Sequence, residues 1–520
     1  MFDGWIWNTV ALAGAGTALL LARRGHARAM LLCAAIVLVA HAAHRDLVVD
    51  DAYITMRFAR HLAEGHGLVF NIGERTEGFT NPLWTLALAG VVRCGGDPLA
   101  FARITGLLCA LATLVLLGHW SLERQNGVPT RASAAVLLLA VNPAFATWAG
   151  SGLETPLFAF LLLASVHATS HDHLRRAGAF AALNVLVRPE AAAVPALLVI
   201  GAWLTRRTFS RRALVELTLP ALVAGLSLLA ARHAYYGTWL PNTYHAKVIW
   251  GIPAAVRGAE YVLRFAVHYG GLFVWSLPFM AGFLLRRGSW EIPAIVALGL
   301  LGSTVLLGGD GLPAFRFLVP VLPLGYLLLQ DVFFAVASHR RTAQIVGVVC
   351  LVALGAHTAN AYPAWRHHRH VMQDFVSIAR WLGPRLGPDD SVAVSAIGAI
   401  GYHTRARVVD RLGLTNRDVA RRRVPGGGAA GHEKYDARYV FEQHPTILTV
   451  DWNGLYPESP LDRGSEALLE RLELRFDGED LVRSSEFARD YEARSVELRE
   501  DGWFVFFVRR DAALALGGNP

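Results

Sequence analysis

The chain has 520 residues, of which 54% are hydrophobic and only 17% are charged. A soluble protein carries about 25% charged residues, and here the deficit falls in apolar segments that recur between residues 5 and 360. The net charge of +8 does not indicate a nucleic-acid-binding protein, because the arginines cluster in short gaps between apolar segments rather than on one folded face. The composition therefore predicts a polytopic α-helical membrane protein.

The apolar segments predict about twelve transmembrane helices, two of which are short enough to be broken helices. We expect them at 5–22, 29–45, 98–118, 132–148, 155–170, 177–189, 191–205, 213–231, 271–285, 291–307, 315–335 and 343–360. Arginine clusters occupy alternate gaps, which the positive-inside rule places in the cytoplasm. With twelve crossings, the gaps 46–97 and 232–270 become long external loops of a membrane domain that spans 1–360.

After residue 360 the composition becomes that of a soluble protein, so we expect residues 361–520 to form an external α/β domain. The pattern predicts a helix at 370–386, strands near 391–396, 446–451 and 503–508, and a glycine-rich loop at 424–431. The four cysteines have no metal-site spacing and do not indicate a disulfide framework.

The first external loop begins with two adjacent aspartates, Asp50 and Asp51, followed by an amphipathic helix of about three turns. Ile54, Phe58 and Leu62 share one face, and Arg57 lies on the charged face. One aspartate is enough to cap a helix, so the second is unexplained by capping. A carboxylate at a membrane surface can act as a base toward a hydroxyl group or bind a cation that faces a phosphate. A second short apolar segment, 82–93, is expected to lie along the external surface.

Residues 50–84, "DDAYITMRFARHLAEGHGLVFNIGERTEGFTNPLW", resemble the first external loop of GT-C glycosyltransferases that use polyprenyl-phosphate sugars. The resemblance is strongest to the mycobacterial terminal arabinofuranosyltransferases and their bacterial relatives. It continues through "SGLETPLF" (151–158), "RPE" (188–190), "LPNTYHAK" (240–247), "GGDGLPAFRFLVPVLP" (308–323) and "DRLGLTN" (410–416). His245 and Ala191 depart from the group's usual residues. The resemblance therefore identifies the type of reaction more closely than it identifies the sugar.

The resemblance implies a GT-C fold in the cytoplasmic (inner) membrane, with the active site and the C-terminal domain on the periplasmic side. It implies that Asp50 or Asp51 is the catalytic carboxylate. The donor would be a polyprenyl-phosphate sugar, expected to be decaprenyl-phosphoryl arabinofuranose, and the acceptor a cell-envelope glycan or a surface protein. Nucleic acid is not an expected partner.

The predicted topology independently places further ionisable or polar residues at the external ends of helices, where they are costly unless paired or facing a cavity. Candidates for binding the donor and its phosphate are Arg57, Arg188, Tyr244, His245, Lys247 and Arg316, and further site candidates are Glu154, Glu190, Asn242 and Asp310. Structural alternatives stay open: Arg188 and Glu190, or Asp310 and Arg316, can form ion pairs, and Glu154 can cap a helix.

Two alternative functions remain, namely a GT-C transferase of another sugar, such as mannose or aminoarabinose, and a transporter of a lipid-linked sugar. A transporter needs ionisable residues near the middle of the membrane, whereas here they lie at one face. We expect no obligatory cofactor, although two adjacent aspartates can bind Mg²⁺ or Mn²⁺.

Overall fold

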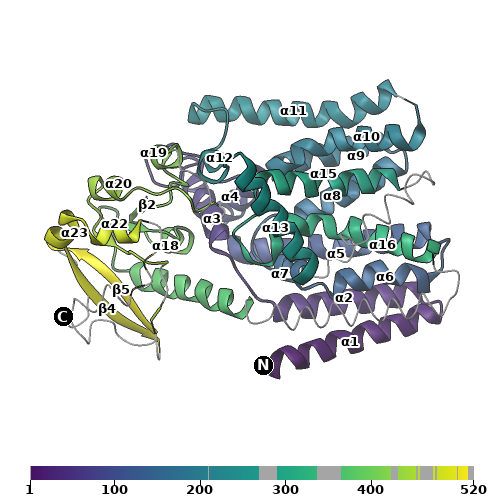
Figure 1. Ribbon diagram of the computed structural model, residues 1–520, viewed down its shortest axis with the longest axis horizontal. Helices are drawn as coiled ribbons and strands as arrows, with labels where there is room; N and C mark the ends of the chain where they lie inside the picture. The colour runs from purple at the N-terminus through teal and green to yellow at the C-terminus, as the bar shows by residue number, and fades with distance from the viewer. Residues whose placement is uncertain are drawn as a thin grey trace.

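The computed structural model describes residues 2–208, 210–268, 290–336, 365–422, 431–452, 455–456, 472, 474, 477–499 and 502–512. A bundle of helices occupies most of the molecule, and a smaller domain that contains the sheet lies at one end of it (Figure 1). The predicted helices 271–285 and 343–360 and most of the glycine-rich segment 424–431 lie outside the described residues.

The bundle combines long apolar helices with several short ones. In chain order they are α1 (Phe2–Arg23), α2 (Ala27–His44), α3 (Asp50–Ala63), α4 (Pro82–Arg93), α5 (Pro98–Arg124), α6 (Pro129–Ala140), α7 (Pro143–Ala149), α8 (Thr155–Ser170), α9 (Leu174–Val187), the 3₁₀ helix η1 (Pro189–Ala193), α10 (Val194–Arg206), α11 (Arg211–Tyr236), α12 (Asn242–Lys247), α13 (Ile252–His268), α15 (Glu291–Leu307), the 3₁₀ helix η2 (Pro313–Val321) and α16 (Leu322–Val336).

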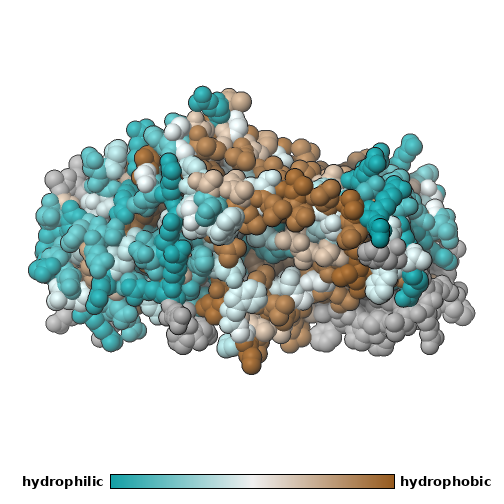
Figure 2. Space-filling model, turned by 90° about the horizontal axis from the view of Figure 1, so that it is seen from above, coloured by the Kyte–Doolittle hydropathy of each residue, from teal (hydrophilic) through white to brown (hydrophobic). Residues whose placement is uncertain are grey.

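Among the described residues, four helical segments are long and apolar enough to cross a membrane, or five if the bent pair α6 and α7 forms one span. The four are Ala27–His44, Pro98–Arg124, Arg211–Tyr236 and Pro313–Phe334, and α4, α8 and α15 are shorter apolar helices. On the face seen in Figure 2, a hydrophobic band separates hydrophilic surfaces at the two ends. The chain is therefore a multi-pass membrane protein.

The prediction of one continuous helix over 132–148 is wrong. The chain bends by 61° between α6 and α7. Pro143 cannot donate the hydrogen bond that would continue α6, and the side chain of Asn142 caps α7 by accepting a hydrogen bond from the Phe145 N–H. The loop predicted over 232–270 is also more ordered than expected, because it contains α12 and the amphipathic helix α13.

The C-terminal domain carries a mixed five-stranded sheet in the order β2-β1-β3-β5-β4. Its elements are β1 (Ser391–Val394), α18 (Gly398–His403), β2 (Arg407–Asp410), α19 (Arg417–Ala420), α20 (Ala437–Glu442), β3 (Ile447–Leu448), α22 (Gly478–Val482), α23 (Ser485–Asp490), β4 (Tyr491–Arg499) and β5 (Gly502–Arg509). Strands β2, β1 and β3 are parallel, and β5 and β4 continue the sheet in antiparallel pairing. A helix over 365–382 precedes the sheet. The helix and three predicted strands are confirmed, whereas β2 and β4 were not predicted.

Buried polar side chains join the C-terminal domain to the membrane domain. Arg57 of α3 is almost fully buried, and its guanidinium donates hydrogen bonds to the carbonyl oxygens of Phe70, Gly401 and Ala406. The Nδ2 atom of Asn242 lies 2.9 Å from the carbonyl oxygens of both Gly413 and Leu414. These contacts fix the positions of α3 and α12 against the C-terminal domain.

Candidate active site

The two adjacent aspartates begin α3, as predicted, but their side chains contact different elements. Asp50 accepts hydrogen bonds from the backbone N–H groups of Gly398 and Ala399, at 2.8 and 2.7 Å, where α18 begins. Asp51 Oδ2 instead lies 3.6 Å from Lys247 Nζ and 3.3 Å from Arg316 Nη1. Asp50 therefore joins two domains, whereas Asp51 faces two cations.

These surroundings shift the two carboxyl groups in opposite directions. Burial raises the pKa of Asp50 to about 6, although the two backbone N–H groups oppose this shift. Burial also acts to raise the pKa of Asp51, but the positive charges of Lys247 and Arg316 outweigh it and lower this pKa to about 2. At neutral pH Asp51 is thus a carboxylate held by two counter-ions.

Because Gly398 touches Asp50, we expect Gly398→Ala to weaken the junction of the two domains. A Cβ atom at Gly398 would lie only 2.0 Å from the carbonyl oxygen of Asp50, and overpacking of this kind costs about 1–3 kcal/mol. Thermal unfolding of the purified protein should show the loss. The control is Gly387→Ala, whose Cβ would lie 3.7 Å from Asp390 Oδ2, an ordinary contact. Equal unfolding temperatures for the two variants would contradict this expectation.

The raised pKa of Asp50 predicts a pH-dependent contribution to stability. Its folded pKa of about 6 exceeds the value of about 3.9 expected in the unfolded chain, so the folded protein binds this proton more tightly. The contribution therefore stabilises the protein below about pH 4 and is lost as the pH rises through about 6. Asp50→Asn lacks this titration. The free energy of unfolding of wild type, minus that of the variant, should therefore be larger at pH 5 than at pH 7.5. Parallel stability profiles over this range would contradict the shift.

Arg316 is positioned by an unusual backbone segment. Ala314 and Phe315, directly before it, have φ values of 57° and 51°, in the left-handed region that is unfavourable for residues with a side chain. The indole N–H of Trp148 donates a hydrogen bond to the Ala314 carbonyl oxygen at 3.0 Å, and the ring of Phe315 packs against Tyr261. This conformation places the Arg316 guanidinium between Asp51 and Asp310, where its Nε lies 2.9 Å from Asp310 Oδ2.

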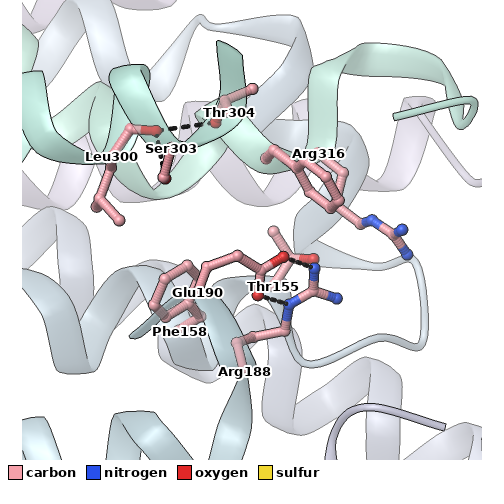
Figure 3. A pocket seen from close by; sticks show the side chains of 9 residues that line it. Thr155, Phe158, Arg188, Glu190, Leu300, Ser303, Thr304 and Arg316 are labelled. Carbon is pink, nitrogen blue, oxygen red and sulfur yellow. Dashed lines mark hydrogen bonds and ion pairs between the residues drawn. The ribbon is translucent and has the colours of Figure 1, made fainter. Parts of the chain in front are cut away.

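A second group of charges surrounds Arg188 at the end of α9. Arg188 donates hydrogen bonds to Glu154 Oε1 at 2.9 Å and to Glu190 Oε2 at 3.1 Å (Figure 3 draws the pair with Glu190). Asn81 donates to the other oxygen of Glu154. Pro189 interrupts helical hydrogen bonding here, so Arg188 is extended and points to both carboxylates.

The Arg188 and Arg316 groups line one pocket. It has an empty volume of about 330 Å³, which includes space open to the surroundings, and its other walls come from Thr155, Phe158, Glu190, Leu300, Ser303, Thr304 and Phe317 (Figure 3). The ring of Phe317 lies 5.3 Å from the guanidinium carbon of Arg188 and 5.4 Å from that of Arg316. Two guanidinium groups, the Glu190 carboxylate and apolar side chains thus line one cavity.

The structure brings Asp51, Lys247, Arg316, Asp310, Arg188, Glu154 and Glu190 into this connected arrangement, which we call the acidic–basic cluster. Within the described part of the chain, five predicted residues do not join it through their side chains, namely Asp50, Arg57, Asn242, Tyr244 and His245. The donors of Arg57 and of Asn242 are directed at protein acceptors, and the Tyr244 hydroxyl accepts a hydrogen bond from the Trp250 indole at 2.8 Å. His245 shares α12 with Lys247, and burial, aided by the nearby cations Arg421 and Lys434, lowers its pKa.

Sequence reasoning missed Asn81, Trp148 and Phe317. An asparagine before a proline at a helix start is typical of a helix cap, but the Asn81 side chain does not cap α4 and instead contacts Glu154. The aromatic residues gave no local signal, because Trp148 and Phe317 lie within apolar segments. Their contacts with residues distant in sequence, Trp148 with Ala314 and Phe317 with Arg188, show their place.

Two curated proteins resemble this chain in sequence. It is 33% identical over 279 residues to the terminal beta-(1->2)-arabinofuranosyltransferase of Mycobacterium tuberculosis, covering 48% of this chain and 43% of that protein. It is 29% identical over 341 residues to the protein of the same name from Corynebacterium glutamicum, and this match covers 53% of this chain and 48% of that protein. The matches thus span less than half the length of these relatives. Residues 362–507 match a family model described as Domain of unknown function (DUF8728).

Solved structures resemble the chain over nearly its whole length. The match to ArnT from Cupriavidus metallidurans bound to undecaprenyl phosphate covers 95% of this chain and 99% of the ArnT chain, with a TM-score of 0.58 and 13% identity. The match to the apo form of ArnT covers 91% of this chain and 96% of the ArnT chain, with a TM-score of 0.54. At this identity the likeness shows the fold, which is an ArnT-like GT-C fold with apolar helices and a C-terminal sheet. The resemblance to terminal arabinofuranosyltransferases in sequence, and to a GT-C glycosyltransferase in fold, is confirmed.

Proposed function

We propose that this protein is a membrane glycosyltransferase that moves a sugar, expected to be D-arabinofuranose, from a polyprenyl-phosphate donor to a glycan or surface-protein acceptor of the cell envelope. The observation that carries the proposal is the contact of Asp51 with both Lys247 and Arg316 at one end of an apolar helix bundle. The named relatives support the choice of sugar, and the lipid-phosphate complex of ArnT supports the choice of donor.

In this proposal, the donor phosphate competes with Asp51 for its two counter-ions. Lys247 and Arg316 pair with the phosphate and stabilise the negative charge that it gains as the bond to the sugar carbon breaks. Asp51, relieved of its counter-ions, then has a higher pKa. It accepts the proton of the acceptor hydroxyl, whose oxygen forms the new bond to the sugar carbon. In a reaction that retains configuration, Asp51 instead attacks that carbon first.

We further propose about twelve spans in the cytoplasmic membrane, with the acidic–basic cluster and the C-terminal domain outside. The arginine-rich gaps support this orientation, since such gaps remain in the cytoplasm. Extracellular protease applied to right-side-out cells should therefore cleave within the C-terminal domain, and cleavage only in inverted vesicles would contradict the orientation.

We propose that transfer needs no obligatory metal ion. Asp51 already faces two cations, and both oxygens of Asp50 accept backbone N–H groups. Both carboxylates therefore already have partners, and neither needs a metal ion to supply one. Loss of activity in a chelator, restored by Mg²⁺ or Mn²⁺, would contradict this.

The experiment that tests the function uses the purified full chain with decaprenyl-phosphoryl arabinofuranose and an arabinan oligosaccharide. Release of decaprenyl phosphate together with extension of the oligosaccharide is the expected result. The mannose and aminoarabinose donors, tested in parallel, establish the sugar. Movement of the intact donor across vesicles without cleavage would overturn the proposal in favour of a transporter.

A further inference from the structure

A separate cluster of ionisable side chains lies where α5 and α8 end. Glu123 is in the last turn of α5, His167 is in the last turn of α8, and His171 directly follows α8. Because α8 begins beside Glu154 and is 16 residues long, this cluster lies about 24 Å along the helix from the acidic–basic cluster. No step of the proposed glycosyl transfer uses these three residues.

The three side chains converge on one point. Glu123 Oε2 lies 3.1 Å from His171 Nε2 and 3.7 Å from His167 Nε2. One ligand atom from each residue can be chosen so that all three atoms lie within 4.8 Å of one another. Ligand atoms around a tetrahedral zinc ion, with bonds of about 2.1 Å, are separated by roughly 3.4 Å. The two measured distances lie on either side of this separation.

The hydrogen bonding of His171 determines which of its ring atoms is available. His171 Nδ1 lies 2.9 Å from the carbonyl oxygen of His167, and a carbonyl oxygen can only accept, so Nδ1 carries a proton. In the neutral ring, Nε2 is then an acceptor that faces a carboxylate oxygen. Two acceptors this close require a cation between them, either a second ring proton or a metal ion. The bond from Nδ1 to a backbone carbonyl is also the contact that commonly orients metal-binding histidines.

We propose that Glu123, His167 and His171 bind a divalent transition-metal ion of the zinc class. Two imidazoles and one carboxylate favour such an ion over Mg²⁺ or Ca²⁺, which prefer oxygen ligands. The side chains of His167, His171 and Glu123 are 23%, 37% and 54% exposed, so an ion can enter from solvent and water can complete the coordination. The ring of His167 packs perpendicular to that of buried Trp120 at 5.3 Å, which restricts its rotation. The bound ion would join the ends of α5 and α8.

The test uses the purified full chain without a histidine tag, stripped of metal and titrated with Zn²⁺ alone against a chromogenic chelator. One zinc ion per chain is expected, and His171→Ala, His167→Gln or Glu123→Gln should each weaken binding at least about a hundredfold. The control is His26→Ala, since His26 is an exposed histidine in the turn before α2 whose side chain makes no capping hydrogen bond.

Two further measurements decide between a metal ion and a ring proton. Cobalt bound in place of zinc should give the strong visible absorption of a tetrahedral site in wild type and lose it in His171→Ala. Zinc should also raise the unfolding temperature of wild type and not that of the ligand variants. Absence of zinc binding by wild type, or equal binding by wild type and the three ligand variants, would overturn the proposal and leave an imidazolium–carboxylate pair.

Discussion

Asp51→Asn is expected to lower the rate of donor cleavage by about a thousandfold or more. The amide keeps the shape of the side chain but cannot accept a proton or attack the sugar, and general-base catalysis alone contributes about 10²–10⁴-fold. The measurement is release of decaprenyl phosphate by the purified variant under donor saturation, which reports the chemical step rather than binding.

A second readout separates a catalytic role for Asp51 from a structural one. In Asp51→Asn, Lys247 and Arg316 lose the carboxylate that competes with the donor phosphate, so decaprenyl phosphate should bind the variant at least as tightly as wild type. The control is Asp46→Asn, because Asp46 lies shortly before α3 and is 39% exposed, with ion pairs to Arg103 and Arg369. Weak lipid binding together with lost activity would point instead to a disturbed structure.

Comparison with Asp50→Asn identifies the catalytic carboxylate. We expect this variant to lose stability rather than chemistry, since an amide can accept only one of the two backbone hydrogen bonds and leaves the other N–H group unsatisfied. Full activity in Asp51→Asn, with inactivity in a folded Asp50→Asn protein, would assign catalysis to Asp50 instead.

The sequence predicted that Asp50 and Asp51 begin a short helix, because capping residues and a periodic apolar face are local signals. It could not distinguish the two carboxylates. The partner of Asp50 is 348 residues away at Gly398, and Arg316 is 265 residues from Asp51. Contacts over such separations depend on how the helices pack, which no local pattern specifies.

The prediction for Arg57 shows the same limit of local patterns. Its place on the charged face of an amphipathic helix predicted a phosphate ligand, but the C-terminal domain covers that face, and backbone carbonyl oxygens accept the hydrogen bonds of the guanidinium. Periodicity separates the two faces of a helix without showing whether the polar face meets solvent, a ligand or another domain.

The strand β4 was missed for a related reason. Most of its side chains are only partly buried, which weakens the alternation of apolar residues that identifies a strand.

Lys247→Ala is expected to weaken binding of the donor phosphate by about ten- to a hundredfold. A charge-assisted hydrogen bond contributes about 1.5–3 kcal/mol, and each 1.4 kcal/mol is a tenfold change in affinity. The side chain is 36% exposed, so its truncation leaves no buried cavity. Binding of decaprenyl phosphate to the detergent-solubilised protein, at two salt concentrations, is the direct measurement.

The chain offers a matched control, because Lys247 and Lys434 are its two lysines. Lys434 Nζ donates hydrogen bonds to the carbonyl oxygens of His245 and Ala420, so Lys434→Ala removes a contact within the protein rather than a phosphate ligand. It should lower the unfolding temperature and leave lipid affinity within about threefold of wild type, a difference smaller than 1 kcal/mol. If both substitutions weakened lipid binding equally, the loss at Lys247 would reflect general disturbance of this region. If neither did, Arg316 and Arg188 would have to hold the phosphate without it, and Asp51 would keep one of its counter-ions during the reaction.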